Sequence, residues 1–138
     1  MKRNIFLLVG RVLVASIFIF SGFSKLIEPY QNFLAVVYSF DILNPATARL
    51  FALIVPWCEF IFGLWFLFGL WTSVSLSVLW LLNSCFIVTI ASALFRKLPI
   101  QTCGCFGGNL PTVPLSDVLV VDGLLWFLFL YLWINSRE

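Results

Sequence analysis

The residues best suited to chemistry are two cysteines separated by one glycine, Cys103-Gly104-Cys105. Two thiols at this spacing can close a small, strained disulfide ring, and strain makes a disulfide easier to reduce. Gly104 and the glycines that follow allow the backbone torsions that a tight ring needs. Arg96 and Lys97, just upstream, could stabilise a thiolate. The motif therefore predicts a redox-active cysteine pair.

Two other interpretations of this pair stay open. The thiols could be inert or structural, or they could be half of a metal site. Because the chain has no histidine, a mononuclear zinc site would also need Cys58 and Cys85. We expect no metal.

The elements that hold this motif must lie in a membrane. Of the 138 residues, 62% are hydrophobic and only 10% are charged, and the mean hydropathy is +1.09. A soluble domain carries roughly 25% charged residues, so a soluble globular protein is excluded, as is a disordered chain. A net charge of +2 without a basic block argues against a nucleic-acid partner. We expect one small domain, residues 1–138, whose main partner is the lipid bilayer.

Four continuous apolar stretches are long enough to cross a bilayer as a helix, which takes roughly 20 residues. They cover about residues 5–27, 48–70, 72–95 and 115–134. Since the stretches do not alternate, strands are excluded, and the predicted fold class is all-α, an integral membrane four-helix bundle. The first stretch could instead be a cleaved signal, but Arg11 interrupts it early, so a retained helix is expected.

Three connections join these spans. A tight turn is expected at residues 69–72, and a short interfacial helix after the first span, with its tyrosines at headgroup level. The cysteine motif lies in the loop 96–114. Basic residues divide four against four between the two sides, so charge does not orient the chain. Thiol redox chemistry favours cytoplasmic termini and an extracytoplasmic loop.

Two further cysteines lie within the spans. Cys58 and Cys85 are each about 15 Å from the loop side, at 1.5 Å per helical residue. They could face each other and form a second redox pair that relays electrons into the membrane. Alternatively, they are small buried hydrophobes.

Ionisable residues inside a bilayer are costly and usually paired. Glu59 and Arg11 approach the midplane from opposite sides, so an Arg11–Glu59 ion pair is expected, as a structural clamp or in catalysis. Lys25 could pair with Asp122 or Glu28 near the cysteine loop, or extend to the interface.

The segment Cys103-Gly104-Cys105-Phe106-Gly107 resembles an element of the MauE branch of the DoxX-like membrane proteins. The stretch 21–26, followed by Glu28-Pro29, resembles that family's first-helix ending. Pro56-Trp57-Cys58-Glu59 is similar to its second-helix pattern, and Asp122 falls where the family has an acidic residue in the last helix. Cys58 and Cys85 cannot be assigned to the family pattern.

The resemblance implies a bacterial inner-membrane protein associated with thiol redox and with maturation of methylamine dehydrogenase. It also implies a thioredoxin-like partner. DoxX and DoxD relatives suggest quinone-linked sulfur oxidation, and hence a membrane quinone as cofactor. Trp57 could wall a pocket for such a molecule.

The main hypothesis is a thiol–disulfide oxidoreductase that exchanges disulfides with a thioredoxin-like protein or a secreted client. Its catalytic residues would be Cys103, Cys105, Cys58 and Cys85. The supporting residues would be Gly104, Phe106, Gly107, Glu59, Arg11, Lys25 and Asp122. The alternatives are a non-enzymatic scaffold whose loops bind a partner, and a transporter or quinone-linked subunit.

Overall fold

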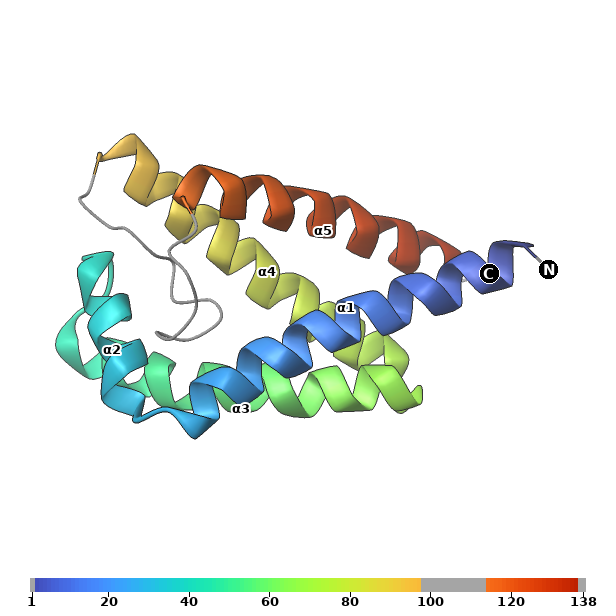
Figure 1. Ribbon diagram of the computed structural model, residues 1–138, viewed down its shortest axis with the longest axis horizontal. Helices are drawn as coiled ribbons and strands as arrows, with labels where there is room; N and C mark the ends of the chain where they lie inside the picture. Colours follow the sequence, from blue (N-terminus) through green and yellow to red (C-terminus); the bar gives the residue numbers. More distant parts are fainter. Residues whose placement is uncertain (1, 98–113, 137–138) are drawn as a thin grey trace.

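Five helices form the part of the chain that the computed structural model describes, residues 2–97 and 114–136. They are α1 (Lys2–Ile27), α2 (Tyr30–Ser39), α3 (Pro45–Phe68), α4 (Thr72–Phe95) and α5 (Leu115–Ser136) (Figure 1). Within these described ranges, α1, α3, α4 and α5 are long and apolar enough to cross a membrane. The predicted helical bundle with four spans is confirmed.

Local sequence explains where α3 begins and ends. The Asn44 side chain accepts a hydrogen bond of 2.9 Å from the Thr47 backbone N–H, and Pro45 occupies the first turn. Both residue types favour a helix start. Gly69 ends the helix in the left-handed region, with φ of 77°, where glycine carries no steric penalty. The chain then turns directly into α4, as the sequence predicted.

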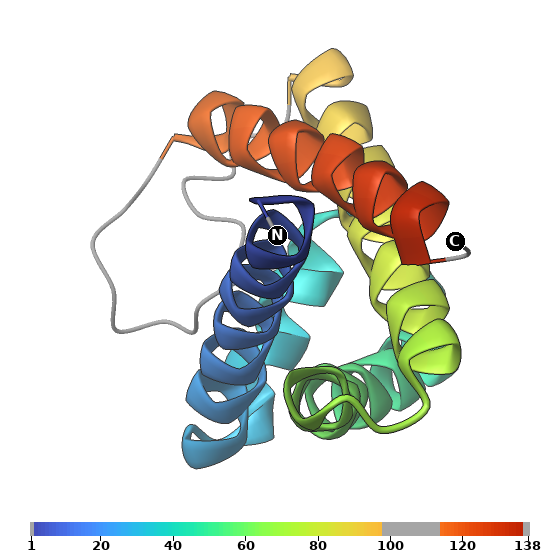
Figure 2. The same cartoon turned by 90° about the vertical axis from the view of Figure 1, so that its right-hand side faces the viewer.

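The spans run alternately up and down, and α1 packs closely on α3 (Figures 1 and 2). A Cβ atom on Gly22 of α1 would lie 2.7 Å from the backbone nitrogen of Phe60 and 2.8 Å from the Pro56 carbonyl oxygen. A Cβ on Gly63 of α3 would lie 2.9 Å from Cγ1 of Ile19. Small residues therefore let these two backbones approach, as is common between helices in membranes.

The bundle core is apolar and the outer surface is apolar as well. Phe18 of α1 and Phe129 of α5 are buried and make an edge-on ring contact, with centroids 5.8 Å apart. Large side chains such as Phe6 and Phe127 are each 65% exposed. Water would penalise such a surface, whereas lipid tails accommodate it.

The short helix expected after the first span is α2, and it packs along the first half of α3. Its apolar face, formed by Phe33, Leu34 and Val37, contacts Ala48 and Ala52. Because α2 packs against the first half of α3, the C-terminal end of α1 contacts α3 nearer to the middle of α3.

Candidate functional site

A buried ion pair joins α1 to α3. The Lys25 Nζ atom lies 2.8 Å from Oε2 and 3.0 Å from Oε1 of Glu59. It also donates to the Ser21 hydroxyl at 3.1 Å, and that hydroxyl donates to Glu59 Oε2 at 3.2 Å. Lys25 is 3% exposed and Glu59 is 0% exposed. Each charge therefore has a partner, without which burial would be strongly unfavourable.

The predicted Arg11–Glu59 ion pair is wrong, because Glu59 pairs with Lys25. Lys25, which was expected to pair with Asp122 or Glu28, contacts Glu59 and also lies within electrostatic range of Asp122. Glu59 lies 14 residues after Pro45, about 21 Å along α3, whereas Lys25 is two residues from the end of α1. The prediction placed the C-terminal end of α1 and the N-terminal end of α3 at the same depth in the membrane. The structure places the α1 end well along α3, so Lys25 reaches Glu59 and Arg11 lies toward the opposite end.

Asp122 of α5 adds a third ionisable group near this pair. Its carboxylate is within electrostatic range of both Lys25 and Glu59. Asp122 is 9% exposed, and its Oδ2 atom has no hydrogen-bond partner among the described residues. The Asn83 side chain of α4 donates to the Asp122 backbone carbonyl at 3.1 Å. We refer to Ser21, Lys25, Glu59, Asn83 and Asp122 as the buried polar cluster.

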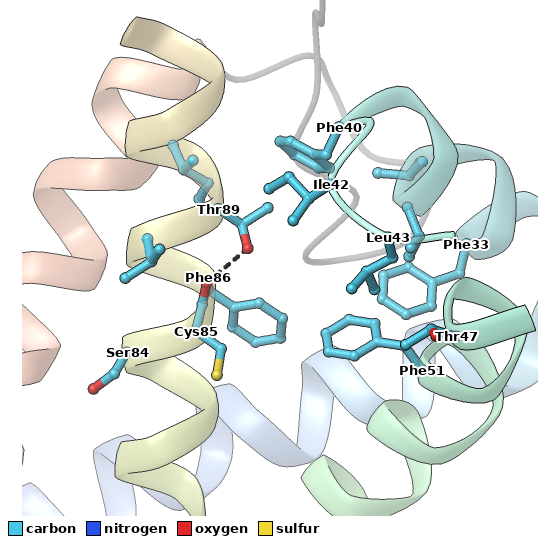
Figure 3. Close-up of a pocket in the computed structure, with 14 residues that line it drawn as sticks. Phe33, Phe40, Ile42, Leu43, Thr47, Phe51, Ser84, Cys85, Phe86 and Thr89 are labelled. Atoms are coloured by element: carbon cyan, nitrogen blue, oxygen red, sulfur yellow. Dashed lines mark hydrogen bonds between the residues drawn. The ribbon is translucent and has the colours of Figure 1, made fainter. Parts of the chain in front are cut away.

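An apolar pocket of about 400 Å³ lies between α2, the start of α3 and α4. Phe33, Phe51 and Phe86 point into it from these three helices (Figure 3). The Cys85 side chain also lines the pocket, and the Thr89 hydroxyl donates to the Cys85 carbonyl at 2.7 Å. The pocket suits a hydrophobic group, with few polar atoms to orient it.

Two of the rings that line this pocket also contact the buried polar cluster. The Lys25 Nζ atom lies 4.9 Å from the ring centroid of Phe33 and 5.1 Å from that of Phe86. Both distances permit cation–π attraction. The ammonium group therefore lies directly behind the aromatic wall of the pocket.

The cysteine motif itself, from Cys103 through Gly104, Cys105 and Phe106 to Gly107, lies outside the described residues. What the structure describes is how the flanking helices are held. Arg96, which caps α4, donates from its guanidinium to the backbone carbonyls of Phe40 and Asp41. Leu115 and Val118 at the start of α5 pack on Ile90 of α4. Both ends of the motif's segment thus leave the bundle on the side of α2.

The family model described as methylamine utilisation protein MauE matches residues 3–135. The chain belongs to the MauE family. No curated protein and no solved structure gave a significant match to the chain. Membership in the MauE family therefore rests on nearly the whole length of the membrane bundle.

The two intramembrane cysteines of this MauE-family chain are both free thiols. Cys85 is exposed and lines the apolar pocket, whereas Cys58 is half-buried on α3, next to Glu59. No disulfide joins them in the described structure. A second redox pair stays a prediction.

Sequence reasoning missed Ser21, Asn83 and the two rings beside Lys25. Ser21 lies four residues before Lys25, on the same face of α1. Asn83 is the one side-chain amide of α4, and an amide in an apolar span commonly bonds to a neighbouring helix. These two signals were present in the sequence. The contact of Lys25 with Phe33 and Phe86 depends on the packing of α2, which has no comparable signal.

Two cavities are candidate sites for the quinone that the family resemblance suggested. Trp57, the suggested wall, is 56% exposed and lines a smaller cavity of about 230 Å³ that also reaches Lys25. The apolar pocket beside α2 offers the larger hydrophobic surface, with hydroxyls from Thr47 and Thr89. Its residues fit a hydrophobic molecule with a polar head. Among the described residues, no group of three metal-ligating side chains gathers.

Proposed function

We propose that this MauE-family protein is a thiol–disulfide exchange protein of the bacterial inner membrane. It uses Cys103 and Cys105 to exchange a disulfide with a thioredoxin-like protein or a secreted client during protein maturation. The observation that carries this proposal is the Cys-Gly-Cys spacing in the segment between α4 and α5. Family membership supports it, because the matched family is described by a role in methylamine utilisation.

The exchange needs no further oxidant, because two electrons pass from the dithiol of one protein to the disulfide of the other. One thiolate of the reduced pair attacks a sulfur of the partner's disulfide, which forms a mixed disulfide and releases one partner thiolate. The second cysteine then attacks the mixed disulfide. The Cys103–Cys105 bond forms, the partner leaves with two thiols, and the reverse sequence oxidises the partner.

The bundle supports this chemistry by holding the ends of the segment. The contacts of Arg96 with the carbonyls of Phe40 and Asp41 fix the end of α4 against the α2–α3 connection. The adjacent Lys97, like Arg96, is positively charged and would favour the thiolate form of a nearby cysteine. The segment that carries the cysteines is therefore attached at both ends to helices that pack within the bundle.

The proposed orientation places the termini in the cytoplasm and residues 96–114 outside it. Four spans put both termini on one side and this connection on the other. The outer side is the oxidising side of a bacterial inner membrane, where disulfides persist.

Trapping of the mixed disulfide tests this function. In a Cys105→Ser variant the resolving thiol is absent, so a partner attacked by Cys103 should stay covalently bound. Cells are acid-quenched and alkylated, and adducts are separated on non-reducing gels. Cys58→Ser and Cys85→Ser serve as matched controls that should form no adduct.

The results separate exchange from the scaffold alternative. A reducible adduct of Cys105→Ser or of Cys103→Ser supports exchange. If neither single variant forms an adduct and the Cys103→Ser/Cys105→Ser variant supports full maturation of the client, the redox function is wrong. The protein would then act as a scaffold.

A further inference from the structure

Another pocket lies at the opposite end of the bundle, lined by residues of α1, α3, α4 and α5. At this end α1 begins, α5 ends and α3 turns into α4 (Figure 2). The volume of the pocket is about 440 Å³, within the roughly 300–1,000 Å³ typical of small-molecule sites. The polar lining residues are Asn4, Arg11, Thr72 and Ser136; the apolar ones are Leu7, Leu8, Phe66, Leu76 and Leu132. We refer to it as the termini pocket.

Among the residues that the structure describes, Arg11 is the only charged side chain of this lining. Its Nε atom is buried and has no hydrogen-bond partner among the described residues. The guanidinium extends toward the α3–α4 turn, where Nη1 lies 3.4 Å from the position that a Cβ on Gly69 would take. A buried donor of a charged group without an acceptor is strongly unfavourable, so an anion in the pocket would supply what is missing.

The start of α4 adds a second attraction for an anion. Thr72, the first residue of α4, lines the pocket, and the preceding Trp71 provides no side-chain cap. The first backbone N–H groups of a helix have no partner within it and carry partial positive charge. None of the acidic side chains in the described residues lines this pocket, so no described carboxylate competes for Arg11.

We propose that the termini pocket binds the phosphate group of an anionic phospholipid, with Arg11 as its main ligand. The apolar walls favour a lipid over free phosphate, since Leu8 and Leu132 offer a surface for an acyl chain beside the charged group. A guanidinium matches the geometry of phosphate oxygens. This site is independent of the cysteine chemistry, because it lies at the other end of the bundle.

Native mass spectrometry of the purified full-length protein tests the proposal, with phosphatidylglycerol and phosphatidylcholine as probes. We expect wild-type protein to retain phosphatidylglycerol in preference to phosphatidylcholine. Arg11→Gln should lower the bound fraction about tenfold, the effect expected for loss of charge-assisted hydrogen bonds. Lys2→Gln is the matched control, because it removes a positive charge at the same end but not from the lining.

A second variant keeps the proposal testable if Arg11→Gln fails to fold. Leu8 is 51% exposed, so Leu8→Trp should fold while filling the pocket, and it too should lose the lipid. The proposal is overturned if either folded variant binds phosphatidylglycerol like the wild type, or if Lys2→Gln loses it equally. Displacement of the lipid by millimolar inorganic phosphate would also overturn it, because the ligand would then be a free anion.

Discussion

Lys25 and Glu59 illustrate how single residues determine the interior of this membrane bundle. Their charges lie 2.8 Å apart in a site with almost no exposure to the surroundings. The Ser21 hydroxyl and two phenylalanine rings complete the surroundings of the ammonium. Such a pair holds two helices in one register, because shifting either helix would leave a charge uncompensated in an apolar medium.

Removing one partner of this pair should be more harmful than removing both. Glu59→Gln removes the carboxylate that contacts the Lys25 ammonium, and we expect the free energy of unfolding to fall by about 3–5 kcal/mol. The double variant Lys25→Met/Glu59→Leu removes both charges and should lose much less. Equilibrium unfolding in mixed micelles measures both values. Equal losses in the single and double variants would show that the pair is not coupled.

The burial of these charges could be predicted from the sequence, but the pairing between them could not. That Lys25, Glu59 and Asp122 are buried could be predicted, because charges in apolar spans must face the interior. The partner of Glu59 could not. Pairing depends on how far α1 is shifted along the axis of α3. Counting residues from the predicted helix ends gives the correct pairing only if the two ends lie at the same depth in the membrane. The length of α3 that α2 occupies places the two ends at different depths.

At the scale of elements, the contact between α1 and α3 depends on two positions without side chains. Gly22 lies against the backbone of α3 near Pro56 and Phe60, and Gly63 lies against Ile19 of α1. Gly22 is one residue from Ser21 and three from Lys25. The close approach that it permits therefore also brings these residues to Glu59.

A methyl group at Gly22 should separate the two helices. In Gly22→Ala the new Cβ would lie 2.7 Å from a backbone atom that cannot move aside. We expect a loss of about 1–3 kcal/mol in the free energy of unfolding, the usual effect of overpacking.

Gly123 of α5 provides the matched control for this prediction. A Cβ there has no neighbouring atom within 4 Å, so Gly123→Ala should be neutral or should stabilise the helix by up to about 1 kcal/mol. Thermal unfolding of both variants in one detergent makes the comparison. If Gly22→Ala were as stable as Gly123→Ala, the close approach of α1 and α3 would be refuted.

Helices could be predicted better than contacts. Continuous apolar stretches indicated α1, α3, α4 and α5, and Gly69 indicated the turn between α3 and α4. Hydrophobicity does not show which helices touch, because every face of an apolar span is apolar. The contact of α1 with α3, and the pocket between α2 and α4, arise from shape and could not be read from composition.

At the scale of the whole molecule, the two ends of the bundle differ in chemistry. One end carries the apolar pocket and both attachments of the cysteine segment, with the buried polar cluster behind the pocket wall. The other end carries Arg11 and the termini pocket. This asymmetry is consistent with a protein whose two ends face different compartments, and the charge count of the sequence did not reveal it.

Reporter fusions test the proposed orientation. Fluorescent protein attached to the N-terminus or the C-terminus should fluoresce, because both ends are expected in the cytoplasm. Alkaline phosphatase fused after Lys97 should be active, because that position lies within the proposed extracytoplasmic segment, residues 96–114. If the phosphatase fusion were inactive at comparable expression and the fluorescent fusions were dark, the orientation would be the reverse of the one proposed.

The most direct test of the central claim is the redox state of Cys103 and Cys105 in intact cells. With Cys58 and Cys85 replaced by serine, these are the only cysteines left in the chain. A membrane-impermeant maleimide is applied before and after mild reduction. Thiol–disulfide exchange outside the cytoplasm predicts labelling only after reduction. Equal labelling without reduction, or labelling only in opened cells, would contradict the account.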